Sequence, residues 1–340
     1  AFDNLYLPRL HRAGFVAPDI DRVTEAATSP GGHVMDSVPG LYTNVLVLDF
    51  KSLYPSIIRT FFVDPLALAV ADQDTDPVPG FLDARFSRHR HILPGLTESL
   101  WHARDAARAA GDAPLATAIK IIMNSFYGVL GTNACRFFDP RLASSITRRG
   151  HRIILGTREV VEGAGYRVIY GDTDSLFVLV GDEVDGARAD AIGAELVTLI
   201  DRHWRDTLRA EHDIRSRLEV QFETRYTRFL MPTVRGMPTG SKKRYAGLAV
   251  QPDGGTRLVV KGLEAARTDW TPLARRFQRE LFRRVFHDEP IEAWVLATRD
   301  ALLAGELDDE LVYRKRLRRE VSDYQRNVPP HVQAARELSR

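Results

Sequence analysis

The pattern of apolar and polar residues predicts a chain that mixes β-strands with long amphipathic helices. Short apolar runs typical of strands alternate with segments in which apolar residues recur every three or four positions. Strands are expected at 42–48, 166–169, 176–180, 218–223, 228–231 and, opening a further strand, 242–247. Helices are expected at about 7–12, 52–58, 96–110, 115–130, 137–163, 188–211, 273–287 and 291–304, with a short last helix after 329–331.

Two of the predicted strands end in aspartate. The strand at 42–48 runs into Asp49, and the turn that follows 166–169 carries Asp172 and Asp174. Aspartate is a common turn residue, so for the turn alone a purely structural role carries about equal weight. Two strands that both present carboxylates favour a shared metal site. Oxygen ligands without His or Cys favour Mg²⁺ or Mn²⁺ over Zn²⁺.

The helices predicted at 96–110 and 115–130 each carry polar residues along one face. These residues are Arg104, Arg108, Lys120, Asn124 and Tyr127. A basic stripe at such spacing is most often solvated surface. Here the short break between the two helices favours an antiparallel pair that aligns both stripes, and cations that converge without matching acids suggest a triphosphate clamp. The sequence contains no P-loop motif, so phosphate binding of that kind is excluded.

Length and charge refine this picture only modestly. A chain of 340 residues is expected to form two or three subdomains. The net charge of +2 hides a local excess, because residues 88–152 contain ten Arg and Lys against four Asp and Glu, and residues 314–319 contain five cations. Basic stretches near a carboxylate centre suit a polyanionic substrate.

The single cysteine and the lack of a targeting pattern bear on location. Cys135 excludes an internal disulfide, agrees with a reducing cytosol and is expected to be a packing residue. No apolar run approaches membrane-spanning length and no signal peptide is present, so a cytoplasmic, nucleoid-associated protein without a membrane partner is expected. The chain starts at Ala1 rather than Met, which suggests a fragment.

Four motifs resemble those of a known family and occur in its order. They are DFKSLYPSII at 49–58, KIIMNSFYG at 120–128, YGDTDS at 170–175 and KKRY at 242–245. Together they resemble the polymerase motifs of family B DNA polymerases. Residues 137–145 and 324–331 are similar to the bacterial DNA polymerase II branch of that family. The resemblance covers nearly the whole chain, and four motifs in order are not expected by chance.

The resemblance implies an α+β polymerase fold of the right-hand type. Residues 1–40 lead into an antiparallel palm sheet backed by helices (41–87 and 136–261), with helical-hairpin fingers (88–135) and a mostly helical partial thumb (262–340). The implied activity is template-directed DNA synthesis, by two-metal transfer of a nucleotide from a deoxynucleoside triphosphate to a primer 3′-OH. The implied partners are primer–template DNA and deoxynucleoside triphosphates. A monomer is expected, and a sliding-clamp partner cannot be read from this sequence.

The same resemblance implies residue roles. Asp49 and Asp174 would be catalytic and would ligate two Mg²⁺ ions, for which Mn²⁺ can substitute, with the Phe50 carbonyl as a further ligand. Asp172 would have a lesser catalytic role near the primer end, and Tyr54 would be the steric gate that excludes a ribose 2′-OH. The other nucleotide-binding residues implied are Arg104, Arg108, Lys120, Asn124 and Tyr127. The DNA-binding residues implied are Gly31, Gly32, Thr173, Lys242, Lys243, Arg244 and Tyr245.

Departures from the family pattern leave alternatives open. Arg108 stands where many relatives carry Lys, and Leu176 stands where Thr is expected. The chain has no room for the upstream 3′–5′ exonuclease carboxylates, which predicts no proofreading, and the thumb is expected to stop short. One alternative is therefore a DNA-binding polymerase fragment with impaired catalysis. A second is another carboxylate–metal nucleotidyl transferase such as a cyclase, which would need neither residues 242–245 nor a basic C-terminal region.

Overall fold

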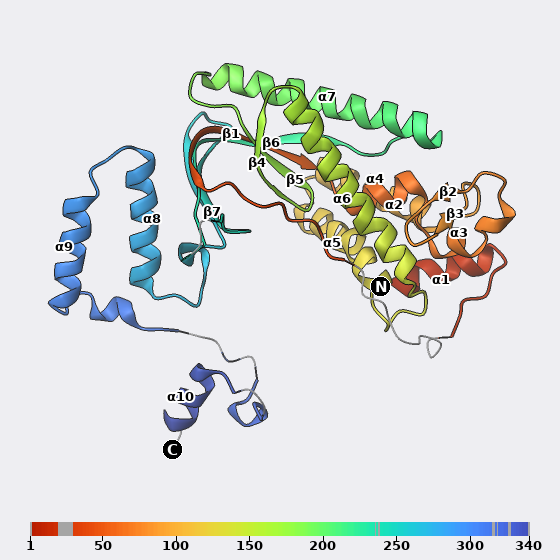
Figure 1. Cartoon of the computed structure of the whole chain (residues 1–340). Helices are drawn as coiled ribbons and strands as arrows, with labels where there is room; N and C mark the ends of the chain where they lie inside the picture. The colour runs from red at the N-terminus through yellow and green to blue at the C-terminus, as the bar shows by residue number, and fades with distance from the viewer. Residues whose placement is uncertain are drawn as a thin grey trace. The chain divides into compact units, whose positions relative to one another are not determined.

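The chain divides into two compact units. The computed structural model describes residues 2–19, 30–234, 236, 239–314, 317, 319–325 and 328–338. The first unit comprises Ala1–Val38 and Tyr42–Arg225, and the second comprises Pro39–Leu41 and Tyr226–Arg340 (Figure 1). Parts of three predicted segments lie outside the described residues, namely Ser29, Lys315, Arg316, Arg318, Arg326 and Asn327.

The β-strands form an antiparallel framework. The strands are β1 (Gly40–Phe50), β4 (Arg167–Asp172), β5 (Ser175–Leu179), β6 (Val220–Met231), β7 (Tyr245–Val250) and β8 (Thr256–Lys261), in the sheet order β4-β5-β1-β6-β7-β8. β5 pairs antiparallel with both β4 and β1, and β7 pairs antiparallel with β6 and β8. Asp49 and Asp172 both lie opposite Ser175 in these registers. The sheet and its helices confirm the predicted α+β class.

The long helices of the first unit agree with the predicted ones to within a few residues. The helices of this unit are α1 (Phe2–Arg12), α2 (Leu53–Phe61), α3 (Pro65–Ala69), α4 (Leu93–Ala109), α5 (Ala113–Leu130), α6 (Pro140–Gly163) and α7 (Gly186–His212). Of these, α3 was not predicted and α1 starts earlier than expected. Short elements lie between α3 and α4: η2 (Ala71–Gln73), β2 (Val78–Pro79) and β3 (Arg85–Phe86). An aspartate begins several helices, as Asp112, Asp139 and Asp185 each accept a hydrogen bond from a backbone N–H of the first turn. Such N-caps fix where these helices start.

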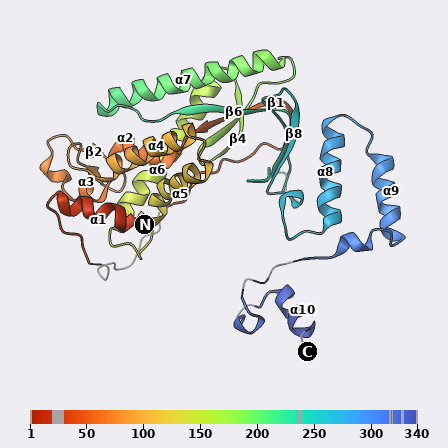
Figure 2. The ribbon, with the colours of Figure 1, turned by 180° about the vertical axis from the view of Figure 1, so that it is seen from behind.

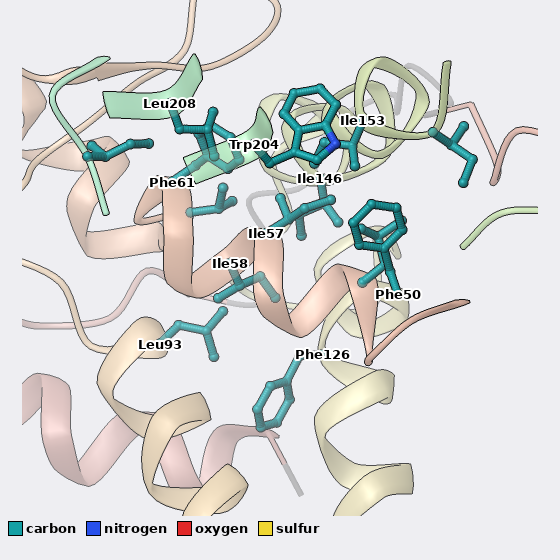
Figure 3. Packing of buried hydrophobic residues seen from close by; sticks show 14 of the residues in the cluster. Phe50, Ile57, Ile58, Phe61, Leu93, Phe126, Ile146, Ile153, Trp204 and Leu208 are labelled. Atoms are coloured by element: carbon teal, nitrogen blue, oxygen red, sulfur yellow. The ribbon is translucent and has the colours of Figure 1, made fainter. Parts of the chain in front are cut away.

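Helix α2, directly after Asp49, lies within the main hydrophobic core. Ile57 and Ile58 of α2 are fully buried, and the helix packs on α4, α5 and α6. Figure 3 shows these side chains among Leu93, Phe126 and Ile146 of the surrounding helices. Helix α6 also packs on α7 and β4, as the two opposite views show (Figures 1 and 2). A close-packed core holds the start of α2, and therefore the end of β1, in one position.

A buried aspartate anchors the N-terminus of α4. Asp64 is fully buried and accepts hydrogen bonds from the backbone N–H groups of Leu93 (2.7 Å) and Ile92 (3.2 Å). It also accepts one from the hydroxyl of Tyr6 at 2.9 Å and one from the backbone N–H of Ala67 at 2.7 Å. Asp64 thus satisfies N–H groups at the beginning of two helices. It ties α4 to α1 and α3.

The second unit has its own small core. Its helices are α8 (Pro272–Phe286), α9 (Glu292–Leu303) and α10 (Pro330–Leu338), with short turns η3 (Glu264–Ala266), η4 (Asp308–Leu311) and η5 (Val321–Asp323). The buried residues of this core are Ala246, Leu248, Leu263, Phe282 and Phe286. Helix α8 therefore packs on β7, and the rings of Phe277 and Trp294 stack at 4.7 Å to join α8 to α9.

Several elements differ from the sequence-based expectation, and α3, β2 and β3 were not among the predicted ranges. Helix α1 begins at Phe2 rather than at residue 7, because Phe2 and Tyr6 stack at 5.1 Å and bury against Phe126 and Phe137. The two strands expected at 218–223 and 228–231 are one continuous strand, β6, with a register shift between Tyr226 and Arg228. Strand β8 was not among the predicted ranges.

Helix α5 corrects the statement that no apolar run reaches membrane-spanning length. Among the described residues it is one helix that is long and apolar enough by length and composition, with a mean hydropathy of 1.3 over 18 residues. One such helix is weak evidence for a membrane, and 28% of this window is buried inside the structure. Met123 and Phe126 of α5 are fully buried in the core. Cys135 is also buried, as expected for a packing residue.

Candidate active site

The predicted acids and cations meet in one cavity of the first unit. Its volume is about 520 Å³, and it lies between the ends of β1 and β6, the β4–β5 turn, and helices α4 and α5. The lining residues are Asp49, Lys51, Ser52, Trp101, Arg104, Asp105, Arg108, Lys120, Asn124, Asp174, Glu219, Gln221 and Glu223. Six of the predicted site residues are therefore brought together: Asp49, Asp174, Arg104, Arg108, Lys120 and Asn124.

Strand pairing places the two aspartates. Asp49 is next to last in β1 and faces Ser175, the residue that follows Asp174. The backbone N–H of Phe50 donates to the carbonyl oxygen of Asp174 at 2.8 Å, which fastens the end of β1 to the turn. Within the turn, the N–H of Asp174 donates to the carbonyl oxygen of Asp172 at 2.6 Å. The hairpin with carboxylates at its tip is thus confirmed.

Both aspartates hold their protons more tightly than usual. Burial, followed by repulsion from Asp174 and Glu223, raises the pKa of Asp49 to about 7, although Lys120 opposes this. Burial also raises the pKa of Asp174 to about 6, with smaller contributions from Asp172 and Glu223. Burial and like charges both disfavour the ionised form. The acids in this cavity therefore carry uncompensated negative charge when they ionise.

Strand β6 supplies site residues that the sequence analysis missed. Glu219, Gln221 and Glu223 alternate along the chain at the start of β6, and all three line the cavity. Alternation by two places side chains on one face of a strand, and this was the signal available in the sequence. The Gln221 amide lies 3.5 Å from a carboxylate oxygen of Asp49, and Glu219 forms an ion pair with Lys51 at the cavity edge.

The cations of α4 and α5 face the acids without being neutralised. Among the described residues, Arg104, Arg108 and Lys120 form no ion pair with an acidic side chain. Arg104 is buried and donates a hydrogen bond of 3.3 Å to the hydroxyl of Ser52. Burial, then repulsion from Arg108, lowers the pKa of Arg104. Guanidinium and ammonium groups in this state are suited to bind an anion.

Tyr54, Tyr127 and Asp172 are outside the cavity lining. The rings of Tyr54 and Tyr127 lie 4.7 Å apart, so Tyr127 contacts Tyr54 instead of joining the stripe formed by Lys120 and Asn124. Burial, followed by Tyr127 and Asp174, raises the pKa of Tyr54 to about 12, which keeps its hydroxyl protonated. Asp172 pairs through its backbone with Val34 and accepts a hydrogen bond from the Thr173 hydroxyl at 3.1 Å.

The predicted DNA-binding residues lie in two places. Gly32 lies next to Thr173 of the hairpin tip, in the first unit. Gly31 belongs to the first unit as well, whereas Lys242, Lys243, Arg244 and Tyr245 belong to the second. There Arg244 pairs with Glu264 at 2.9 Å. Tyr245 opens β7 and packs against Phe229, with the ring centroids 5.3 Å apart.

The donor atoms of the cavity fit a hard divalent cation. Asp49 and Asp174 offer carboxylate oxygens whose repulsion a cation would relieve, and Mg²⁺ and Mn²⁺ prefer such ligands. Within the part of the chain that the structure describes, no group of three or more His, Cys, Asp or Glu side chains is arranged to hold a metal by itself. A Mg²⁺ ion characteristically uses one or two carboxylates together with water and substrate phosphates, and this pair of aspartates is suited to that mode.

A family model and several known proteins match this chain. A family model described as DNA polymerase family B matches residues 3–80 and 87–340. The chain is 58% identical over 339 residues to DNA polymerase II of Escherichia coli strain K12, which covers 99% of this chain and 43% of that protein.

More distant polymerases also match over most of the chain. It is 30% identical over 348 residues to a DNA polymerase of Archaeoglobus fulgidus, covering 98% of this chain and 40% of the relative. It is 29% identical over 334 residues to a DNA polymerase of Thermococcus gorgonarius, covering 91% of this chain and 39% of the relative. The chain thus spans less than half the length of these relatives.

Proposed function

The chain belongs to DNA polymerase family B, and we propose that it carries out template-directed DNA synthesis, adding deoxynucleotides to a primer 3′-OH. The observation that carries the proposal is the meeting of carboxylates from β1 and the β4–β5 turn with un-neutralised cations from α4 and α5 in one cavity. Phosphoryl transfer requires positioning and charge stabilisation more than covalent chemistry. A cavity with acids on one side and cations on the other provides both.

The proposed architecture is a right hand. Residues 41–87 and 136–261 form the palm, 88–135 the fingers and 262–340 the mostly helical thumb, with 1–40 leading into the palm. The antiparallel pairing of β1, β4 and β5 and the contact between helices α4 and α5 support this assignment for palm and fingers.

The palm carboxylates are proposed to hold divalent cations. Asp49 and Asp174 bind two Mg²⁺ ions, or Mn²⁺ in their place, together with the carbonyl oxygen of Phe50. Such ions, when bound, stabilise the negative charge that develops on the transferred phosphate and on the leaving pyrophosphate. Asp172 lies beside the primer end and stabilises the turn that orients Asp174.

The fingers are proposed to bind the incoming nucleotide. Arg104, Arg108 and Lys120 hold the triphosphate through charge-assisted hydrogen bonds, and Asn124 donates a further one. Tyr54 lies beneath the sugar and excludes a 2′-hydroxyl, and Tyr127 supports it by ring contact. The hydrogen bond from the backbone N–H of Phe50 to the carbonyl oxygen of Asp174 holds the end of β1, and therefore Asp49, in a fixed position.

The proposed macromolecular partner is primer–template DNA, bound by a monomer in the cytoplasm. Its contacts are Gly31, Gly32, Thr173, Lys242, Lys243, Arg244 and Tyr245. Contacts made mainly to phosphates release counterions, so the affinity for duplex DNA is expected to fall steeply with salt concentration.

The experiment tests whether nucleotide incorporation depends on a template strand. The chain is given a primed duplex with Mg²⁺ and each deoxynucleoside triphosphate separately, with the same primer lacking a template strand as control. Incorporation only of the nucleotide complementary to the template base supports the proposal. Nucleotide turnover that proceeds without DNA would instead support a cyclase-like transferase.

A further inference from the structure

The segment 31–35 lies against the hairpin that carries the site aspartates. The backbone N–H of Thr173 donates to the carbonyl oxygen of His33 at 2.7 Å, and the N–H of Met35 donates to that of Gly171 at 2.9 Å. Between them, Val34 pairs antiparallel with Asp172. The segment therefore extends the pairing of β4 at its tip and fixes the position of the turn.

The turn held in this way is strained. Thr173 has a φ of 59°, in the left-handed region that β-branched residues rarely adopt. Such a conformation persists only where the surroundings hold it. The hydrogen bond from Thr173 to His33 is one restraint, and the contact of Thr173 with Gly32 is another.

Gly32 has no space for a side chain. A Cβ atom at this position would lie 2.6 Å from Oγ1 and 2.8 Å from Cγ2 of Thr173, and 3.1 Å from the hydroxyl oxygen of Tyr54. A Cβ at the neighbouring Gly31 would meet nothing within 4 Å. The two glycines are adjacent, and they differ in the space around a Cβ atom and in the hydrogen bond of 2.8 Å between the Gly31 carbonyl oxygen and Nε2 of His151. Only Gly32 is in contact with both the hairpin tip and Tyr54.

Tyr54 is confined from other directions as well. A Cβ at Gly150 of α6 would lie 3.3 Å from Cε1 of Tyr54, and the Tyr127 ring lies 4.7 Å away. Close packing leaves Tyr54 little freedom, so a group added on one side must move it or a neighbour. The hydroxyl end of Tyr54 is the part nearest Gly32.

We propose that Gly32 is a specificity-determining residue, because the space it leaves sets where the hydroxyl end of Tyr54 lies. This inference rests on the proposed function, in which Tyr54 lies beneath the sugar of the incoming nucleotide. Gly32 acts through Tyr54 and is a positioning residue. Misplacement of a positioning group by about 1 Å can cost up to about 100-fold in rate, so a displaced Tyr54 changes how deoxyribose and ribose are distinguished.

The experiment compares Gly32→Ala with Gly31→Ala. On one primer–template, kcat/KM is measured for a deoxynucleotide and for the matching ribonucleotide, and their ratio is the readout. The ratio is expected to fall about tenfold in Gly32→Ala and to stay within about twofold in Gly31→Ala. Displacement of Thr173 or weaker DNA binding affects both nucleotides alike and cancels in the ratio.

Two further variants locate the effect at Tyr54. In a Tyr54→Phe background the hydroxyl that Gly32→Ala would meet is gone, so the change in ratio caused by Gly32→Ala is expected to shrink, as in a double-mutant cycle. In Gly150→Ala the added methyl group on α6 would contact the Tyr54 ring, and the ratio is expected to fall by a smaller factor. Alanine is favourable inside a helix, so Gly150→Ala keeps the test valid if Gly32→Ala fails to fold.

The outcomes separate this inference from the function on which it rests. An unchanged ratio in active Gly32→Ala, or in Gly150→Ala where Gly32→Ala does not fold, overturns the role of Gly32. An equal fall in Gly31→Ala overturns it too, because the effect would then belong to the loop as a whole. If the unsubstituted chain incorporates neither nucleotide opposite a template, the proposed function itself fails.

Discussion

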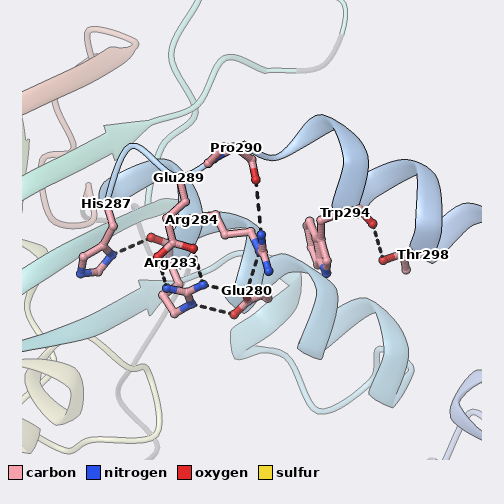
Figure 4. A network of polar contacts seen from close by, with 8 residues as sticks. All are labelled: Glu280, Arg283, Arg284, His287, Glu289, Pro290, Trp294 and Thr298. Atoms are coloured by element: carbon pink, nitrogen blue, oxygen red, sulfur yellow. Dashed lines mark hydrogen bonds and ion pairs between the residues drawn. The ribbon is translucent and has the colours of Figure 1, made fainter.

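The pKa values of carboxylates are shifted in opposite directions in two regions of this protein. In the cavity of the first unit, burial and mutual repulsion raise the pKa of Asp49 to about 7 and that of Asp174 to about 6. On helix α8 of the second unit, hydrogen bonds from Arg283 and Arg284 lower the pKa of Glu280 to about 2. Figure 4 shows this α8 network, in which Arg283 contacts both Glu280 and Glu289.

The difference indicates how a ligand-binding site can be distinguished from a structural network of charged side chains. The α8 network is complete, because each of its acids has a cation within hydrogen-bonding distance, and its role is to join α8 to the turn before α9. In the cavity, Asp49 and Asp174 form no ion pair with the cations Arg104, Arg108 and Lys120 of the facing helices among the described residues. Groups whose charges are left uncompensated are costly to the fold and are expected where a ligand completes them.

Removing a cavity carboxylate is expected to have the largest effect. Asp174→Ala should lower templated incorporation by about a thousandfold or more, because charge stabilisation by a bound cation is worth several kcal/mol. Binding of duplex DNA should change little. Incorporation rates and duplex affinity measured together check this. Substantial synthesis by the variant would remove Asp174 from the metal site.

Removing an un-neutralised cation comes next. Lys120→Ala should raise KM for the deoxynucleoside triphosphate by about 10- to 100-fold, since a charged hydrogen bond contributes about 1.5–3 kcal/mol. Arg90→Ala is a matched control, because Arg90 is an exposed cation of the same unit that donates to Gln73. Equal effects of both substitutions would show that general positive charge, and not Lys120, binds the triphosphate.

The raised pKa values predict a pH-dependent affinity for Mg²⁺. Cations bind the ionised carboxylates, and protons compete as the pH falls below the pKa of Asp49, at about 7. The apparent affinity should therefore weaken by about tenfold per pH unit below this value for each proton displaced. Calorimetric titration of the chain with Mg²⁺ between about pH 5.5 and about pH 8 measures it. A flat profile would contradict the assigned environment of Asp49.

The raised pKa values also predict that replacing Asp49 by a neutral residue increases the free energy of unfolding. A carboxyl group with a raised pKa binds more protons in the folded state, so the free energy of unfolding falls as pH rises from about 4 to about 7. After allowance for solvent screening, Asp49→Asn should restore about 1 kcal/mol, or roughly 2 °C in Tm, at about pH 8. No gain is expected at about pH 4. Thermal unfolding at both pH values checks this, and a loss of stability at the higher pH would contradict it.

The smallest effect is expected in the α8 network. Glu280→Gln removes one acid from an exposed cluster, and exposed ion pairs contribute little, so Tm should change by no more than about 1–2 °C. The Mg²⁺ affinity should be unaffected. A fall in Tm well beyond about 2 °C would contradict the distinction drawn between the two regions.

Much of the fold and of the site could be predicted because the signals were local. Asp49 ends a run of apolar residues and Asp174 lies in a turn between two such runs, so strand pairing was enough to bring them together. The helical spacing of Arg104 and Arg108 placed them on one face. The helices predicted at 115–130, 137–163 and 188–211 correspond to α5, α6 and α7 to within three residues at their starts.

What could not be predicted depends on contacts between distant residues. Gln221 and Glu223 lie in the strand predicted at 218–223, but they join the cavity only because β6 lies beside β1 in the sheet, which the sequence did not indicate. The sequence analysis did not identify Asp64, because its full burial and its hydrogen bonds to Tyr6 and Leu93 arise from tertiary packing. Tyr127 has the right spacing for the stripe, yet it packs on Tyr54.

The most direct measurement is templated primer extension with Mg²⁺, comparing this chain with its Asp49→Ala/Asp174→Ala variant. Thermal unfolding and duplex binding of both proteins are measured alongside. The account predicts extension by the unsubstituted chain alone, with both proteins folded and both bound to DNA. Extension by the folded double variant at a comparable rate would show that the cavity is not where nucleotidyl transfer takes place.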